Sequence, residues 1–225
     1  MLEFAIWITV GFISGSVPWA IIVGKLLVRG DIRGVGDGNP GATNAWKSGG
    51  WVPGVLSMIL EVGKGSVPVY IAIQYLNPPS DGPAQLGLAL IAIAPVIGHA
   101  WSPFLRFKGG KALAASWGSW IGMTGGGALL VGCILLAIMH ALQKNHAVTV
   151  TICLVGFLLV FLPTHQLGIC IASLWLMNIM IVIYKHRHEY SKGIIARNWI
   201  CLLYTSPSPR DATLWGMPSY AWKKK

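Results

Sequence analysis

Acidic residues are scarce in this sequence, and charge of either sign is low. The 225 residues include only 7 Asp and Glu against 17 Lys and Arg, and charged residues make up 11% of the chain. A soluble globular domain normally carries about 25%. Hydrophobic residues reach 54%. These proportions argue against a water-soluble core and predict an all-α integral membrane protein, because uncharged apolar runs of about 18 residues or more are typical of transmembrane helices.

Cysteine is also sparse. The four Cys residues lie mostly inside apolar runs and form no Cys-x-x-Cys pair, so we expect buried free thiols rather than disulfides. The His, Asp and Glu residues form no convincing metal cluster, and we expect neither a metal nor another cofactor.

Apolar runs recur along the chain and predict about seven transmembrane helices. The fourth run is short and is separated from the fifth by a Gly-Gly-Gly break. The predicted spans are Leu2–Lys25, Gly54–Leu76, Ala84–His99, Ala112–Met123, Ala128–Leu142, His146–Leu162 and Leu167–Tyr184.

The connecting loops alternate between basic loops and loops without Lys or Arg, such as Asn77–Pro83 and Pro163–Gln166. The positive-inside rule then predicts that the N-terminus lies outside and the C-terminus in the cytoplasm. The net charge of +10 is explained by these cytoplasmic loops facing lipid or substrate phosphates rather than by nucleic acid. Residues 1–200 form one predicted membrane domain. Residues 201–225, with Ser-Pro pairs and no periodicity, are predicted to be a disordered or non-native tail.

A glycine-rich segment, "GVGDGNPGATNAWKSGG", follows the first predicted span. It contains a G-x-G-x-x-G pattern at Gly36, Gly38 and Gly41, which is weak evidence here because a transmembrane helix, not a β-strand, precedes it. Glycines nevertheless allow successive amides to point at an anion. Pro40 suits the first turn of a short helix, whose N-terminus would attract phosphate. That helix would carry Thr43, Asn44 and Lys47. A simple flexible loop is the alternative.

A second basic loop, "GHAWSPFLRFKGGKALAASW", follows the third predicted span. Gly109 and Gly110 precede a helix-forming "KALAA", so free amides and Lys111 are expected at a helix start. These groups suit a substrate phosphate, and ordinary contact with lipid headgroups is the alternative. The loop also carries His99, Ser102, Arg106 and Lys108.

Glu61 and Lys64 lie three residues apart inside the second predicted span. Intramembrane charges are costly and are functional candidates. Alternatively, the two neutralise each other and brace their helix, or Lys64 reaches the glycine loop. After the last span, the stretch His186–Glu189 either edges the same site or forms a solvated cluster.

Four of these segments together resemble one enzyme family. They are "SGSVPWA" (14–20), "DIRGVGDGNPGATNAWKSGG" (31–50), "LEVGKG" (60–65) and "GHAWSPFLRFKGGKALA" (98–114). The chain resembles a divergent member of the bacterial glycerol-3-phosphate acyltransferases that use acyl-phosphate, the PlsY family. The resemblance implies a seven-helix enzyme of the bacterial plasma (inner) membrane with its active site on the cytoplasmic face.

The implied reaction is acyl transfer from acyl-phosphate to the 1-hydroxyl of glycerol 3-phosphate, giving lysophosphatidic acid and phosphate in phospholipid biosynthesis. Membrane lipids are the other expected partners, and a monomer is expected. The phosphate leaves easily, so the protein must position two phosphorylated substrates and screen their charge rather than form a covalent intermediate. The chain departs from the family at Asp37, where the family has Ser, and at Lys47, where it has Arg. Its final motif is only partly met by His186 and Arg187.

The expected site residues fall into three sets. His99 is the best side-chain base, although a substrate phosphate oxygen could do that work. The expected catalytic residues are Asp37, Lys47, His99, Lys111 and His186. The expected phosphate-binding residues are Gly36, Gly38, Asn39, Gly41, Thr43, Asn44, Lys108, Gly109 and Gly110. The supporting residues are Glu61, Lys64 and Ser102.

Two other functions fit parts of the sequence. Broken helices around a cationic site would suit a transporter of a phosphorylated anion, although the polar loops cluster on one face. A lipid-binding paralogue without catalysis would suit Asp37, because a carboxylate repels a bound phosphate by about 1–4 kcal/mol at close range.

Overall fold

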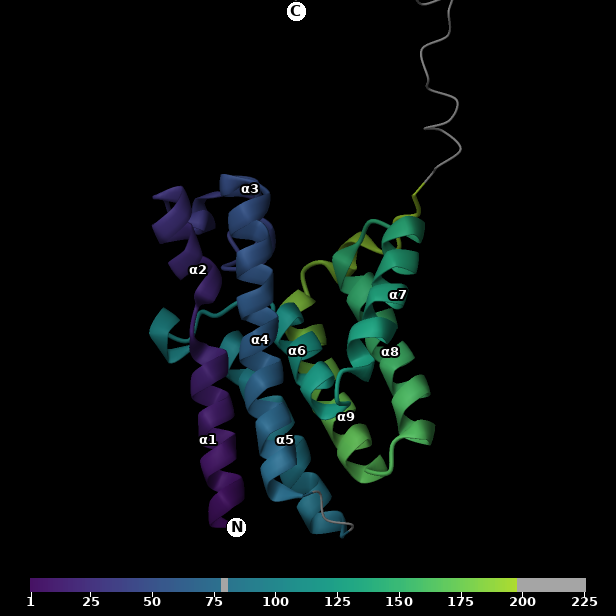
Figure 1. The fold of residues 1–225 in the computed structure, drawn as a ribbon. Coiled ribbons are helices and arrows are strands. Elements are labelled where there is room, and N and C mark those ends of the chain that lie inside the picture. Colours follow the sequence, from purple (N-terminus) through teal and green to yellow (C-terminus); the bar gives the residue numbers. More distant parts are fainter. Residues whose placement is uncertain (78–80, 198–225) are drawn as a thin grey trace, which may run out of the picture.

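The protein is a bundle of helices in the computed structural model, which describes residues 1–77 and 81–197 (Figure 1). The tail predicted for 201–225 lies outside the described residues. The α-helices are α1 (Leu2–Ser16), α2 (Trp19–Val23), α3 (Ala42–Gly49), α4 (Trp51–Leu76), α5 (Gly82–Ala100), α6 (Leu113–Met123), α7 (Gly127–Leu142), α8 (His146–Thr164) and α9 (Gly168–His186). Short 3₁₀ or π turns are η1 (Gly24–Val28), η2 (Ile32–Gly34), η3 (Pro103–Leu105) and η4 (Tyr190–Lys192).

The predicted helical membrane architecture is confirmed, but the lengths of the helices differ. In the described chain, 5 candidate segments are long and apolar enough to cross a membrane: Leu2–Val28, Trp51–Leu76, Gly82–Leu105, His146–Thr164 and Gly168–His186. Helices α6 and α7 occupy the fourth and fifth predicted runs with 11 and 16 residues. At 1.5 Å per residue, each is shorter than the roughly 30 Å hydrocarbon core. Gly125 and Gly126, with φ of 58° and 101°, make the predicted break between them.

The first predicted span is not one continuous helix. Helix α1 ends at Ser16, Val17 is extended, and α2 begins after Pro18. Proline has no amide hydrogen and disfavours a helical conformation in the residue before it, which explains the break. The groups that the break leaves unpaired find partners on α4: Lys64 Nζ donates to the Val17 carbonyl at 2.8 Å, and the Ala20 amide donates to Glu61 Oε1 at 3.1 Å.

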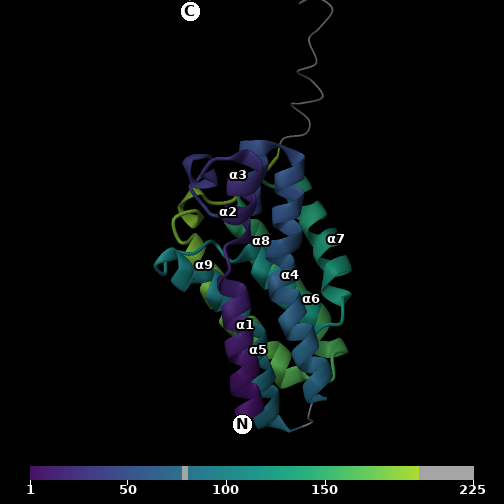
Figure 2. The same cartoon turned by 60° about the vertical axis from the view of Figure 1, so that its left-hand side comes forward.

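The helices approach closely at small residues. A Cβ added to Gly118 of α6 would lie 2.1 Å from the Val62 carbonyl oxygen of α4, and one added to Gly15 of α1 would lie 2.1 Å from the Pro95 oxygen of α5. Both pairs of helices therefore pack backbone against backbone, as membrane helices do where small residues face each other. Figures 1 and 2 both show the N-terminus at the end of the bundle opposite α3.

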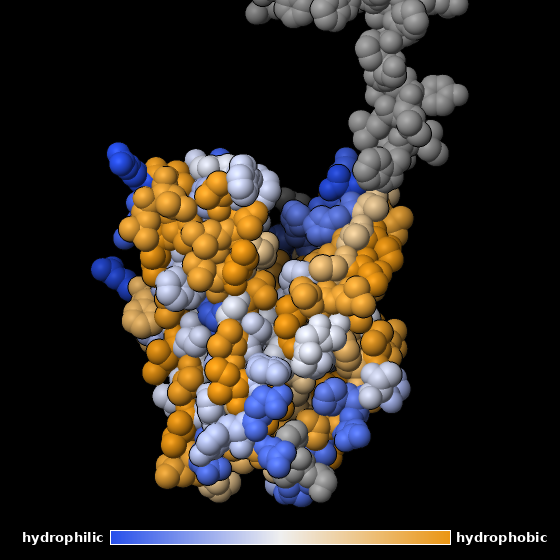
Figure 3. Space-filling model, viewed as in Figure 1, coloured by the Kyte–Doolittle hydropathy of each residue, from blue (hydrophilic) through white to orange (hydrophobic). Residues whose placement is uncertain are grey.

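The buried core runs through α5, α6 and α9 and includes one polar chain of contacts. Trp120 is fully buried, and its Nε1 donates to Asn178 Oδ1 at 3.1 Å. Asn178 Nδ2 donates in turn to Ser116 Oγ at 2.8 Å. Many large apolar side chains point outward instead, and they colour much of the molecular surface in Figure 3. An apolar exterior suits a protein solvated by lipid.

Candidate active site

The glycine-rich segment folds into a tight loop followed by α3. Gly36 and Gly38 have φ of 65° and 72°, a region where a side chain is strained. The predicted short helix is confirmed, but it begins at Ala42 with Gly41 as its N-cap, so Pro40 precedes it rather than sitting in its first turn. No side chain caps this N-terminus, which leaves its first amides available to an anion.

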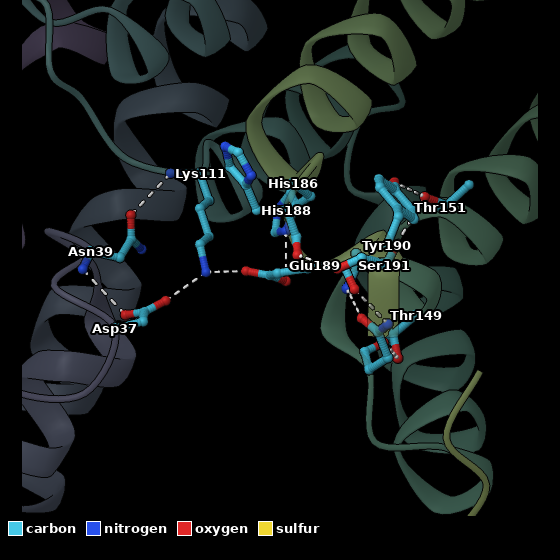
Figure 4. Close-up of polar contacts among 12 residues, drawn as sticks. Asp37, Asn39, Lys111, Thr149, Thr151, His186, His188, Glu189, Tyr190 and Ser191 are labelled. Carbon is cyan, nitrogen blue, oxygen red and sulfur yellow. Dashed lines mark hydrogen bonds and ion pairs between the residues drawn. The ribbon is translucent and has the colours of Figure 1, made fainter. Parts of the chain in front are cut away.

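Asp37 organises this loop. Its Oδ1 accepts hydrogen bonds from the Asn39 amide at 3.2 Å and from Asn44 Nδ2 at 3.0 Å. Its Oδ2 pairs with Lys111 Nζ at 2.5 Å. Asn39 also accepts the Lys111 amide on Oδ1 at 3.1 Å. The glycine loop and the second basic loop, predicted separately as phosphate-binding segments, are therefore joined by direct contacts (Figure 4).

Lys111 also bridges to the far side of the molecule. Its ammonium contacts Glu189 Oε1, and Glu189 Oε2 lies 3.0 Å from His186 Nδ1. Figure 4 shows the resulting row Asp37–Lys111–Glu189–His186, which we call the carboxylate bridge. Lys111 thus has two carboxylate partners at once, and a phosphate that binds Lys111 must compete with both.

The charges in this bridge stabilise one another. Partial burial opposes ionisation of Asp37, but hydrogen bonds from Lys111, the Asn39 amide and Asn44 outweigh it and lower the pKa of Asp37 to about 2. Burial likewise opposes ionisation of Glu189, and its contacts with Lys111 and His186 lower its pKa. The same carboxylates raise the pKa of Lys111 against its partial burial. All three groups are charged at neutral pH.

A second polar cluster lies buried beneath the loop. Glu61 Oε2 is 2.6 Å from Lys64 Nζ and 3.0 Å from His99 Nδ1, and all three side chains are nearly inaccessible. The predicted neutralising pair of Glu61 and Lys64 is present, and it also fills the α1–α2 break. Lys64 does not reach the glycine loop, because its ammonium is held by Glu61 and the Val17 carbonyl.

A cavity of about 270 Å³ connects the two clusters. Its polar lining comes from the start of α3, Glu61, His99 and Lys111, together with His140 and His146. Its apolar lining comes from α4, α6, α7 and α8: Met58, Leu113, Trp117, Leu136, Val150, Cys153, Leu154 and Phe157. Figure 3 shows the molecule hollowed between α4 and α7 at the end that carries α3. The cavity is thus lined by charged and polar groups on one part and by apolar side chains on the other.

The structure does not gather every predicted residue at this cavity. Lys108 lines a separate hollow with Lys25, Arg33 and Arg106. Ser102 is buried, and its Oγ donates to the Ser16 carbonyl at 2.6 Å, which is a structural tie. Lys47 is exposed, and its ammonium lies near Gly36 rather than in the cavity lining.

Two of the amides expected to be free in the second basic loop are bonded within the protein. The Gly110 amide donates to the His99 carbonyl at 3.1 Å, and the Lys111 amide donates to Asn39. The glycines serve close packing instead: a Cβ on Gly109 would lie 2.0 Å from the His99 oxygen, and one on Gly110 would lie 2.4 Å from His99 Nε2. The uncapped starts of α3 and α6, whose first residues line the cavity, are therefore the remaining candidates for amide contacts to phosphate.

Two residues that contribute contacts at the site, Glu189 and Asn145, were not among the site residues predicted from the sequence. Glu189 was noted only as part of a cluster after the last span; it lies in the turn after α9, three residues beyond His186. Asn145 was missed. Its Nδ2 donates to the Glu189 carbonyl at 3.1 Å and to the Gly193 carbonyl at 2.7 Å, which anchors the segment carrying Glu189. Among the described residues, no group of three or more His, Cys, Asp or Glu side chains is arranged to hold a metal ion.

The fold and the site together define a class: an all-helical integral membrane protein whose cavity pairs a lysine, histidines and an uncapped helix start with an apolar wall. Comparisons with known proteins narrow this class. The family profile described as glycerol-3-phosphate acyltransferase matches residues 5–195. Glycerol-3-phosphate acyltransferase 1 of Thermotoga maritima is 34% identical over 209 residues, covering 86% of this chain and all of the relative. The enzyme of Neisseria meningitidis serogroup C is 32% identical over 188 residues, covering 82% of this chain and 90% of the relative.

Two solved structures share the fold. The crystal structure of PlsY (YgiH), an integral membrane glycerol 3-phosphate acyltransferase, in its glycerol 3-phosphate form superposes with a TM-score of 0.71 at 24% identity, covering 90% of this chain and 99% of the other. Its lysophosphatidic acid form gives a TM-score of 0.70, covering 84% and 90%. The chain belongs to the glycerol-3-phosphate acyltransferase family.

Proposed function

We propose that this protein transfers an acyl group from acyl-phosphate to the 1-hydroxyl of glycerol 3-phosphate, releasing lysophosphatidic acid and inorganic phosphate. Membership of the glycerol-3-phosphate acyltransferase family supports the enzyme class and glycerol 3-phosphate as the acceptor. One observation supports the chemistry most directly: the cavity connects a buried His99–Glu61 pair to the uncapped N-terminus of α3 and to Lys111. A base, two kinds of anion-binding group and an apolar wall then face one space.

His99 is our proposed general base. Glu61 occupies its Nδ1 at 3.0 Å, which orients the ring and leaves Nε2 as the nitrogen that can accept a proton. As the acceptor hydroxyl attacks the acyl carbon, its proton passes to Nε2 or to a phosphate oxygen. The bond between the acyl carbon and the phosphate oxygen then breaks, and phosphate leaves with its bonding electrons. A positioned base contributes about 100- to 10,000-fold in rate.

The phosphates would be held by the first amides of α3 and by Lys111. The Ala42 and Thr43 amides lie in the uncapped first turn beside the cavity, where the helix dipole favours an anion. Lys111 would screen the second phosphate after exchanging a carboxylate for it. The acyl chain would lie along the apolar walls of α7 and α8 and enter from the bilayer.

The finer membrane arrangement is also a proposal. We place the N-terminus outside and the C-terminus in the cytoplasm of the bacterial inner membrane, because the basic loops cluster at the end that carries the cavity. Residues 1–200 form the single catalytic domain, active as a monomer. Helices α6 and α7 would together complete the predicted seven-helix arrangement. Cysteines introduced singly at Glu3 and Lys144 should react with an impermeant reagent from opposite sides of the membrane.

The test uses the purified full chain in detergent with palmitoyl-phosphate as donor. We expect release of inorganic phosphate, matched by lysophosphatidic acid, only when glycerol 3-phosphate is present. His99→Gln should lower kcat by about 100-fold or more. His165→Gln is a matched control, because His165 lies at the turn between α8 and α9, outside the cavity lining.

Other outcomes would count against the enzyme. No acyl transfer to glycerol 3-phosphate or to related polyol phosphates would exclude the proposed reaction. Flux of a phosphorylated anion into proteoliposomes without acyl transfer would favour the transporter. Lipid binding without either activity would favour the non-catalytic paralogue.

A further inference from the structure

A second hollow lies apart from the reaction cavity, and it collects basic residues. Its volume is about 540 Å³. It is lined by Pro18, Ile21, Ile22, Lys25, Arg33, Phe104, Leu105, Arg106 and Lys108, none of which lines the reaction cavity. In Figures 1 and 2 the short teal helix η3, which forms its edge, projects beside α1 and α2, away from α7. We call this feature the basic hollow.

The basic hollow carries an excess of positive charge. Arg33 is neutralised by Asp31, with Arg33 Nη2 2.6 Å from Asp31 Oδ2. Within the described residues, Lys25, Arg106 and Lys108 make no ion pair within 4 Å. Three unneutralised cations around one hollow favour an anionic ligand, and separation from the reaction cavity leaves that ligand outside the proposed chemistry.

The basic hollow sits where membrane helices end. Lys25 lies near the end of the candidate span Leu2–Val28, and Arg106 directly follows the candidate span Gly82–Leu105. Residues at the ends of spans lie at the level of the lipid headgroups. The cations are therefore at the depth at which a bilayer presents phosphate groups.

The turn that carries Arg106 and Lys108 is strained and firmly tied. Arg106 and Phe107 both adopt left-handed backbone conformations, with φ of 52° and 61°. The Phe107 amide donates to the Ser102 carbonyl at 2.9 Å, and the Ser102 hydroxyl is tied to Ser16. Strain of this kind persists only where surrounding contacts enforce it. The turn is thus held in a shape that its own sequence disfavours.

This shape exposes two aromatic rings beside the cations. Phe104 and Phe107 are each 63% exposed, and Leu26 on η1 is 72% exposed. Apolar side chains next to unpaired Lys and Arg are typical of segments that rest in the interface, with rings in the acyl boundary and cations at the phosphates.

We propose that the basic hollow binds the phosphodiester headgroup of an anionic bilayer phospholipid. Lys25, Arg106 and Lys108 contact its phosphate, and Phe104 and Phe107 lie against its acyl chains. This lipid is neither the acyl donor nor the product, because no residue of the basic hollow lines the reaction cavity. Lys108, which sequence reasoning assigned to substrate phosphate, belongs to this lipid site.

The test measures lipid retention, so it does not depend on the proposed reaction. The purified full chain in detergent is incubated with phosphatidylglycerol or phosphatidylcholine, and bound lipid is counted by native mass spectrometry. We expect retention of phosphatidylglycerol over phosphatidylcholine. Lys25→Gln/Arg106→Gln should lower that retention by about tenfold. Lys144→Gln/Arg187→Gln removes the same charge from exposed positions outside the basic hollow and should leave retention unchanged.

Competition with inorganic phosphate distinguishes a lipid site from a site for a soluble anion. We expect inorganic phosphate in large excess to leave bound phosphatidylglycerol in place, because it lacks acyl chains to contact Phe104 and Phe107. Equal retention by the Lys25→Gln/Arg106→Gln variant and the wild-type protein would overturn the proposal. Displacement by inorganic phosphate at equimolar concentration would also overturn it, by showing that a soluble anion is the ligand.

Discussion

At the level of single residues, the ion pair of Asp37 and Lys111 joins the glycine loop to the second basic loop. The family resemblance predicts a Ser at the position of Asp37. Asp37 uses both carboxylate oxygens: one accepts hydrogen bonds from the Asn39 amide and Asn44 Nδ2, and the other pairs with Lys111 at 2.5 Å. A serine could keep the first of these contacts but not the second. Asp37 therefore serves loop geometry in part and restrains Lys111 in part.

Replacement of Lys111 separates its proposed role from its structural role. We expect Lys111→Ala to lower kcat/KM by about 100-fold or more, because a phosphate would lose its main cation. The melting temperature should fall by only about 2–4 °C, since the ion pairs lost are partly exposed and such pairs are weak. Lys144→Ala, another lysine at the same end of the molecule, is the control for removal of charge. Near-normal turnover by Lys111→Ala would rule out this assignment.

Asp37→Ser tests whether the carboxylate helps or hinders. A fixed negative charge near a bound phosphate repels it by about 1–4 kcal/mol, so we expect activity on glycerol 3-phosphate to stay the same or rise by up to about tenfold. Steady-state kinetics with varied glycerol 3-phosphate would show a KM that is equal or lower. An inactive variant would instead mean that this enzyme uses the carboxylate in place of the hydroxyl.

At the scale of elements, the close packing of α4 against α6 depends on Gly118. Gly118→Ala should lower the melting temperature by roughly 5–10 °C, because its Cβ would overlap the Val62 oxygen and force the helices apart. Gly63→Ala on α4 is the matched control: no atom lies within 4 Å of its added Cβ, and alanine favours a helix. Thermal unfolding followed by circular dichroism would compare them, and equal melting temperatures would refute the close packing.

Asn145 connects the α7–α8 turn to the segment that carries Glu189. Its Oδ1 also accepts from the Ala147 amide at 3.0 Å as the N-cap of α8. Asn145→Asp keeps the cap but loses the two donated bonds, whereas Asn145→Ala loses both functions. We expect both variants to lower kcat/KM by roughly tenfold, and only Asn145→Ala to lose about 1 kcal/mol of capping stability. Wild-type kinetics in Asn145→Asp would show that Glu189 needs no such anchor.

At the scale of the whole molecule, the carboxylate bridge links the glycine loop to the segment after α9 beside the reaction cavity. Because the pKa of Asp37 is lowered from 3.8 to about 2, its ionised form stabilises the folded state above pH 4, and that contribution is lost as the pH falls from about 4 to 2. The melting temperature of the wild-type protein should exceed that of Asp37→Asn at about pH 6, and the difference should shrink toward about pH 2. A difference that is constant with pH would exclude this role for the charge.

Much of the membrane architecture could be predicted from the sequence alone. Apolar runs and Gly125–Gly127 placed the helices within a few residues, because lipid requires each backbone polar group to be satisfied inside its own helix. The break at Pro18 was missed, although proline is a local signal for it. The contacts that Glu61 and Lys64 make at the break come from residues more than forty positions away along the chain.

The local signals for the site were also present in the sequence: paired glycines, an exposed helix start, isolated charges within an apolar span and motifs of a known family. What only the tertiary structure decided is which of these groups meet. Lys111 contacts partners 74 and 78 residues away in sequence, while Lys108, three residues earlier, lies in another hollow. Residues close in sequence can point to different sides of a backbone, so charge patterns along the chain indicate candidate anion-binding segments, and only packing determines which cavity each side chain lines.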